Sequence, residues 1–115
     1  MLYYATIQNS GLVDRDAHIL QRALWAFPEV EKLVLYGSRA KGNFDTRSDV
    51  DLALYGAEVT DYIAARFADV LTDGLNLFRR VDVVSPAHLL NPRLVEEIEK
   101  HGVVIYEKDP VPGQG

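Results

Sequence analysis

The sequence contains no cysteine and only one methionine and one tryptophan among its 115 residues. The absence of cysteine excludes disulfide bonds and thiolate metal ligands, and it fits a reducing compartment. No apolar run approaches the roughly 18 residues that a membrane-spanning helix requires. The first ten residues combine neither a basic region nor a long apolar stretch, which is unlike a secretory signal peptide. We therefore expect a cytoplasmic protein without a membrane segment.

The chain also lacks the excess of positive charge that proteins use to bind long nucleic acids. Lysine and arginine number 12 against 17 acidic residues, and the formal net charge is -5. Binding of a duplex usually requires a basic surface that displaces counterions from phosphates. Three of the basic residues lie within residues 39–47, close to acidic residues in the same part of the chain. Local charge of both signs suits a small phosphate–metal complex, so we expect a nucleotide ligand and no direct binding of long nucleic acid.

The sequence does contain alternating amphipathic and short apolar segments, which are typical of a one-domain α/β (α+β) protein. The predicted elements, in chain order, are a helix at 14–27, strands at 33–36 and 49–54, a helix at 60–74, a strand at 81–84, helical starts at 86 and 92, and a strand at 103–106. We expect a small mixed β-sheet with helices packed on it in a domain of residues 1–106. Residues 107–115, with two prolines and two glycines, are expected to form a flexible tail.

Two expectations concern the N-terminal part of the chain. The first ten residues are compatible with an extra strand or with a loose interface segment, and the pattern does not decide between them. Asp14 is the expected N-cap of the first helix, and Trp25 and Phe27 near its end are assigned to the core.

Residues 37–52 carry the most informative pattern, which reads GSRAKGNFDTRSDVDL. Gly37 directly follows a predicted strand, so the backbone can turn sharply and a phosphate can approach its amide groups. Ser38 adds a hydroxyl, and a helical turn beginning there would direct its positive end at the anion. Arg39 and Lys41 add positive charge, with Arg39 nearer the turn, although solvated basic residues are also common in loops. We predict that these four residues bind a nucleotide.

Three aspartates on predicted strands are the candidate metal ligands and catalytic residues. Asp49 and Asp51 stand two positions apart, so both carboxylates project from one face of a strand. Carboxylates that are close together repel each other unless a cation lies between them, and Mg²⁺ prefers such oxygen ligands. Asp82 lies opposite its apolar neighbours in the next strand and adds a third carboxylate. The alternatives are a polar loop followed by an edge strand and, for Asp82, a surface position.

This segment resembles the Gly-Ser-x10-Asp-x-Asp signature of the polymerase β-like nucleotidyltransferase superfamily, with ten residues between Ser38 and Asp49. In size the chain is similar to the stand-alone minimal nucleotidyltransferases of the MNT type, and the resemblance covers roughly residues 14–106. It implies the nucleotidyltransferase fold, ATP as substrate and two Mg²⁺ ions. It also implies that Asp49, Asp51 and Asp82 form the catalytic metal site.

MNT-type proteins are typically antitoxins encoded beside a HEPN-domain toxin. The resemblance implies transfer of AMP from Mg-ATP to a tyrosine hydroxyl of a cognate toxin, with which the chain would form a hetero-oligomer. The alternatives are neutralisation by binding and masking the toxin, and nucleotidyl transfer to a small molecule such as an aminoglycoside. The length favours a protein acceptor, because 115 residues leave no room for a second substrate-binding domain.

Overall fold

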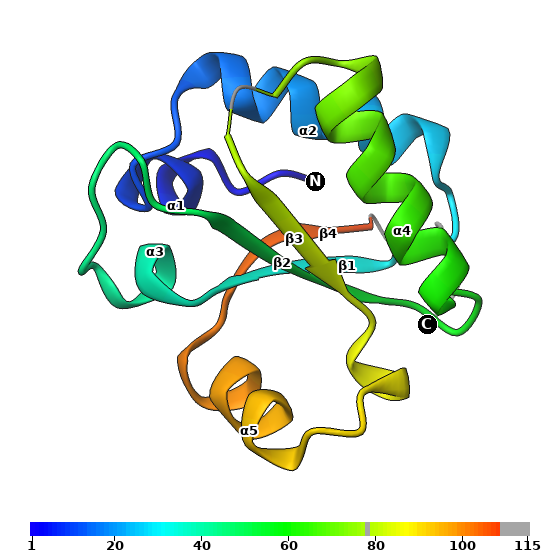
Figure 1. Cartoon of the computed structure of the whole chain (residues 1–115). Coiled ribbons are helices and arrows are strands. Elements are labelled where there is room, and N and C mark those ends of the chain that lie inside the picture. Colours follow the sequence, from blue (N-terminus) through cyan, green and yellow to red (C-terminus); the bar gives the residue numbers. More distant parts are fainter. Residues whose placement is uncertain (78, 109–115) are drawn as a thin grey trace, which may run out of the picture.

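The computed structural model describes residues 1–77 and 79–108, which form a four-stranded sheet with helices on both faces (Figure 1). The elements are α1 (Tyr4–Asn9), α2 (Asp14–Ala26), β1 (Lys32–Tyr36), α3 (Ser38–Lys41), β2 (Val50–Tyr55), α4 (Asp61–Asp69), the π-helix η1 (Val70–Gly74), β3 (Val81–Val84), the 3-10 helix η2 (Pro86–His88), α5 (Pro92–His101) and β4 (Val103–Glu107). The expected strands and long helices are confirmed. Of the expected tail, residues 109–115 lie outside the described part of the chain.

The strand order is β3-β2-β1-β4. Strand β1 pairs antiparallel with both β2 and β4, whereas β2 and β3 are parallel. The parallel pair is joined through α4, as a parallel connection requires a crossover segment. The expected small mixed sheet of an α+β domain is therefore confirmed.

The alternation of side chains along the strands creates two apolar layers. Helices α1, α2 and α4 cover one face of the sheet, and α5 covers part of the other (Figure 1). The larger layer contains Leu33 and Leu35 of β1 with Phe67 of α4, and the smaller one places Val34 against Ile98 of α5. In the described part of the chain, only α5 covers the face that carries the smaller apolar layer, so one end of that sheet face stays available for polar side chains. Among the described helices, none has the length and apolar character needed to cross a membrane.

Two expectations for the N-terminal part were wrong. The first ten residues are neither a strand nor a loose segment, since Tyr4–Asn9 form helix α1 and Leu2 makes a single antiparallel bridge to Tyr106. Trp25 is 74% exposed and lies outside the core. At 100° per residue, the positions that bury Leu24 and Phe27 turn Trp25 towards solvent.

The ends of the helices follow ordinary capping chemistry, with one correction. The Thr60 hydroxyl accepts a hydrogen bond from the backbone N–H of Ile63 at the start of α4. At α2 the N-cap is Val13 and not Asp14, because the Asp16 carboxylate accepts from the Val13 N–H at 2.8 Å. Asp16 is consequently buried, and it has a second partner that is described below.

Candidate active site

The sheet register brings two of the predicted aspartates side by side. Asp51 of β2 pairs with Asp82 of β3 and, on its other side, with Tyr36 of β1. Directly paired residues project from the same face of a sheet, so the two carboxylates and the phenol share one face. This is the face on which α5 packs, at the end of the sheet that α5 leaves open. The expected convergence of strand aspartates is therefore present for this pair.

Asp49 lies just before β2 and is exposed, as is Asp82, whereas Asp51 is half-buried. Burial raises the pKa of Asp51, and the negative charges of Asp82 and then Asp49 raise it further. Burial also raises the pKa of Tyr36, with additional contributions from Asp82 and Asp51. The charges of Asp82 and Asp49 thus act on Asp51, and those of Asp82 and Asp51 act on Tyr36.

The turn after β1 depends on glycine. Gly37 has φ +75° and ψ -152°, a conformation that is almost exclusive to glycine. A Cβ atom built on Gly37 would overlap the Oδ2 atom of Asp51. The carboxylate therefore lies against the backbone of the turn, and α3 begins immediately afterwards at Ser38. The expected short helical turn at Ser38 is confirmed, and it starts beside the half-buried aspartate.

The donor set fits a divalent cation that is shared with a substrate. Within residues 1–77 and 79–108, no group of three or more His, Asp or Glu side chains is arranged as a metal site by itself. Mg²⁺ in nucleotide enzymes is usually held by one or two carboxylates, with phosphate oxygens and water completing its octahedron. The neighbouring Asp51 and Asp82, with Asp49 two positions away, could supply those carboxylates. Without a cation, burial and then the charges of Asp82 and Asp49 raise the pKa of Asp51.

Arg39 and Lys41, the two basic residues predicted to bind the nucleotide, have partners within the protein. Arg39 is 2% exposed, and its guanidinium donates to backbone carbonyl oxygens within the protein. The Lys41 ammonium forms an ion pair with Glu97 of α5, and this hydrogen bond lowers the pKa of Glu97. Among the hydrogen bonds and ion pairs of the described residues, neither group contacts Asp49, Asp51 or Asp82. Phosphate contact by Arg39 or Lys41 thus stays a prediction, and the structure gives both side chains other partners.

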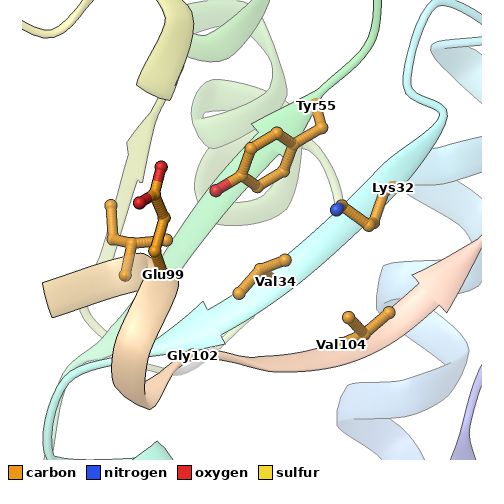
Figure 2. Close-up of a pocket in the computed structure, with 7 residues that line it drawn as sticks. Lys32, Val34, Tyr55, Glu99, Gly102 and Val104 are labelled. Atoms are coloured by element: carbon orange, nitrogen blue, oxygen red, sulfur yellow. The ribbon is translucent and has the colours of Figure 1, made fainter. Parts of the chain in front are cut away.

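A separate pocket of about 310 Å³ lies on the same face of the sheet, beyond α5 (Figure 2). The Lys32 ammonium stands 4.5 Å from the centre of the Tyr55 ring, and the Glu99 carboxylate lies near the phenol. Burial and then Glu99 raise the pKa of Tyr55. None of the predicted site residues lines this pocket, and Ile98 of its wall packs with Tyr36 in the smaller apolar layer. In the sequence, this pocket could have been indicated only by the polar residues at the strand ends, Lys32 and Tyr55.

Comparisons with known proteins identify the class to which this fold and turn belong. The family model described as "Polymerase beta, Nucleotidyltransferase" matches residues 19–111. The chain therefore belongs to the polymerase beta nucleotidyltransferase family, and the resemblance inferred from the Gly-Ser-x10-Asp-x-Asp pattern is confirmed. No curated protein sequence matches the chain significantly.

Solved structures with the same fold include three informative relatives. A toxin–antitoxin crystallised with AMP-PNP is 19% identical, with TM-score 0.65 over 84% of this chain and 75% of that one. The complex of a tri-AMPylated Shewanella oneidensis HEPN toxin with an MNT antitoxin is 18% identical, with TM-score 0.60 over 82% and 71%. A protein described as a minimal nucleotidyltransferase is 28% identical, with TM-score 0.56 over 79% and 95%. The nucleotidyltransferase fold is thus confirmed.

The raised pKa of Asp51 predicts how the metal-free protein responds to pH. An acid whose pKa is higher in the folded than in the unfolded state destabilises the fold once it ionises. Relative to the Asp51→Asn variant, the wild type should therefore lose stability as the pH rises from about 3.8, the ordinary value, through the raised pKa of Asp51. Urea unfolding of both proteins across this range measures the difference.

Mg²⁺ should reverse this destabilisation at neutral pH, because it offsets the repulsion between the carboxylates. We expect Mg²⁺ to raise the Tm of the wild type more than that of Asp51→Asn. Asp69→Asn, an exposed change at the far end of α4, is the matched control and should respond like the wild type. Equal Mg²⁺ responses of wild type and Asp51→Asn would contradict the metal assignment.

Proposed function

We propose that this chain is a Mg²⁺-dependent nucleotidyltransferase that transfers AMP from ATP to a tyrosine hydroxyl of a cognate HEPN-type toxin and thereby neutralises it. The observation that carries the proposal is the pairing of Asp51 with Asp82 beside the glycine turn at Gly37. Membership of the polymerase beta nucleotidyltransferase family supports the reaction class. The toxin–antitoxin relatives support the kind of partner, and one of them contains an AMPylated toxin.

The residues of the site have separate roles in the proposed reaction. Mg²⁺, when bound, would neutralise the triphosphate and lower the pKa of the attacking hydroxyl. Asp49 and Asp51 would hold the cations, and Asp82 on β3 would complete the site on the side where an acceptor approaches. The turn at Gly37 allows phosphates to approach the backbone, and the Ser38 hydroxyl can donate to them. The acceptor oxygen would give up its proton to water and bond to the α-phosphorus, while the bond from that phosphorus to the bridging oxygen breaks and pyrophosphate leaves.

The acceptor is proposed to come from the partner. Asp49 and Asp82 are exposed, so a side chain presented by another protein can reach them. The pocket beyond α5 is separated from these carboxylates by the apolar layer that contains Ile98, so it is poorly placed to hold an acceptor for them. A docked toxin tyrosine meets the geometric need, as the reacting oxygen must come within about 3–3.5 Å of phosphorus.

Masking of the toxin without chemistry is the second candidate. It is favoured by one observation: the two basic residues predicted to contact phosphate, Arg39 and Lys41, have protein partners, so the triphosphate has fewer obvious cationic contacts. In that case binding alone would neutralise the toxin, and the nucleotide would be dispensable.

The proposal is tested by incubating the protein with Mg²⁺, ATP labelled at the α-phosphate and the protein encoded beside it. We expect label on a tyrosine of that neighbour, and none when Mg²⁺ is chelated. Label absent from the neighbour, while the two proteins form a stable complex that neutralises it, would overturn AMP transfer in favour of masking. Label on an aminoglycoside in the absence of any partner would instead favour the small-molecule reaction.

A further inference from the structure

The loop of residues 43–48, which leads into the site, is held from inside by a buried arginine. Arg39 donates from Nη1 to the Ser10 carbonyl at 2.8 Å, and from Nε and Nη2 to the Ser48 carbonyl at 3.2 and 3.0 Å. A longer bond of 3.4 Å runs from Nη2 to the Asp45 carbonyl. One guanidinium therefore joins the end of α1 to the middle and the last residue of this loop.

The surroundings of Arg39 fix its position. The Phe44 ring lies 5.3 Å from the guanidinium carbon, at cation–π distance. Gly11, with φ +79°, lies against both groups: a Cβ there would overlap the Phe44 ring and lie 3.0 Å from Arg39 Nη1. The turn between α1 and α2 thus packs directly on the arginine and the aromatic ring.

A second arginine holds the same loop. Arg79 donates from Nη1 to the Thr46 carbonyl at 3.1 Å. Its Nε and Nη2 atoms contact the buried carboxylate of Asp16 at 3.1–3.2 Å, and Asp16 in turn caps α2. Burial lowers the pKa of Arg39, and the charge of Arg79 lowers it further. The loop is therefore held by two guanidinium groups, one on α3 and one bound to α2.

Burying a guanidinium is costly, and well-packed apolar residues often give equal or better stability. What the arginines provide is directionality, because their planar donors fix three loop carbonyls in defined places. Asp49 follows Ser48 directly, is exposed and precedes β2, so the loop determines where its carboxylate lies. Asp51 needs no such support, since the sheet register holds it.

We propose that Arg39 and Arg79 are positioning residues that fix the loop of residues 43–48 and, through it, the Asp49 carboxylate; the catalytic part of this inference rests on the proposed function. Arg39 then acts through the backbone and not by contact with phosphate. Arg39 affects the reaction by holding the proposed metal-binding carboxylates in place.

The test compares Arg39→Lys and Arg79→Lys with Arg47→Lys, a matched change at an exposed residue of the same loop. Lysine keeps the charge but cannot span the carbonyls as a planar fork. We expect faster hydrogen exchange at amides 43–50 and weaker Mn²⁺ binding in the first two variants only. In transfer assays, kcat should fall by roughly 10–100-fold, with little change in KM for ATP.

Unchanged exchange and unchanged Mn²⁺ affinity in Arg39→Lys would overturn the inference, as would a raised KM for ATP with kcat preserved, the pattern expected of phosphate contact. If Arg39→Lys is too unstable to study, Arg79→Lys applies the same criteria. Exchange and Mn²⁺ binding need no transfer activity. A wild type that transfers no AMP would therefore overturn the proposed function, while these two measurements still decide the positioning role.

Discussion

Asp49→Asn combined with Asp51→Asn is expected to abolish AMP transfer and, with it, neutralisation of the partner. Asparagine keeps the size of the side chain but removes the charge that binds the cation. Residues that only hydrogen-bond to a metal ligand typically change metal affinity or activity by about 10–100-fold when mutated. Loss of two ligands should therefore lower kcat/KM by more than about 100-fold. Labelling of the partner and its residual toxicity in cells are the two measurements.

The double variant should remain folded and become more stable without metal, since it removes an ionised carboxylate whose pKa is raised by burial and then by the charges of Asp82 and Asp49. Asp69→Asn should match the wild type in every assay, which controls for the loss of acidic charge. A double variant that neutralises the partner as well as the wild type would assign neutralisation to masking, whatever its transfer rate.

Gly37→Ala should damage both fold and chemistry. The observed φ of +75° with ψ of -152° strains any residue with a Cβ, by about 1–3 kcal/mol. The added methyl group would also overlap Asp51 Oδ2 and displace the carboxylate that pairs with Asp82. We expect transfer to fall by more than about 100-fold, as for loss of a metal ligand. Urea unfolding and the transfer assay measure the two effects.

Gly42→Ala separates backbone strain from displacement of the carboxylate. Gly42 ends α3 with φ +82°, but a Cβ there would meet no atom within 4 Å. This variant should lose about 1–2 kcal/mol of stability from left-handed strain, while transfer is largely retained. Equal loss of transfer in both variants would mean that strain near α3, and not the contact with Asp51, accounts for the defect.

The strands and the turn at Gly37 could be predicted from the sequence because each signal there is local. Apolar runs ending at Tyr36 and alternation after Asp49 specify strands, and a glycine between strand and helix specifies the turn. The signature spacing from Ser38 to Asp49 added the family, which the family match confirms. The roles of the individual residues stay predictions until the variants are measured.

What the sequence could not predict depends on long-range packing. Helix α1 has six residues, too few for a periodic signal, and it forms where Ile7 is buried against the core. The parallel register that places Asp82 beside Asp51 is set by pairing between strands that are far apart in the chain, so no local pattern specifies it. Phosphate contact by Arg39 is predicted from its position in the sequence and stays a prediction, whereas its bonds to the carbonyls of Ser10 and Ser48 depend on the fold.

The most direct test of the carboxylate site is a crystal structure with Mn²⁺ and a non-hydrolysable ATP analogue, read from the anomalous signal of manganese. We predict a peak between Asp49 and Asp51, bridged to the phosphates that lie over the Gly37 turn, with Asp82 on the side open to the acceptor. Manganese at other residues, with the analogue bound away from these aspartates, would contradict the account.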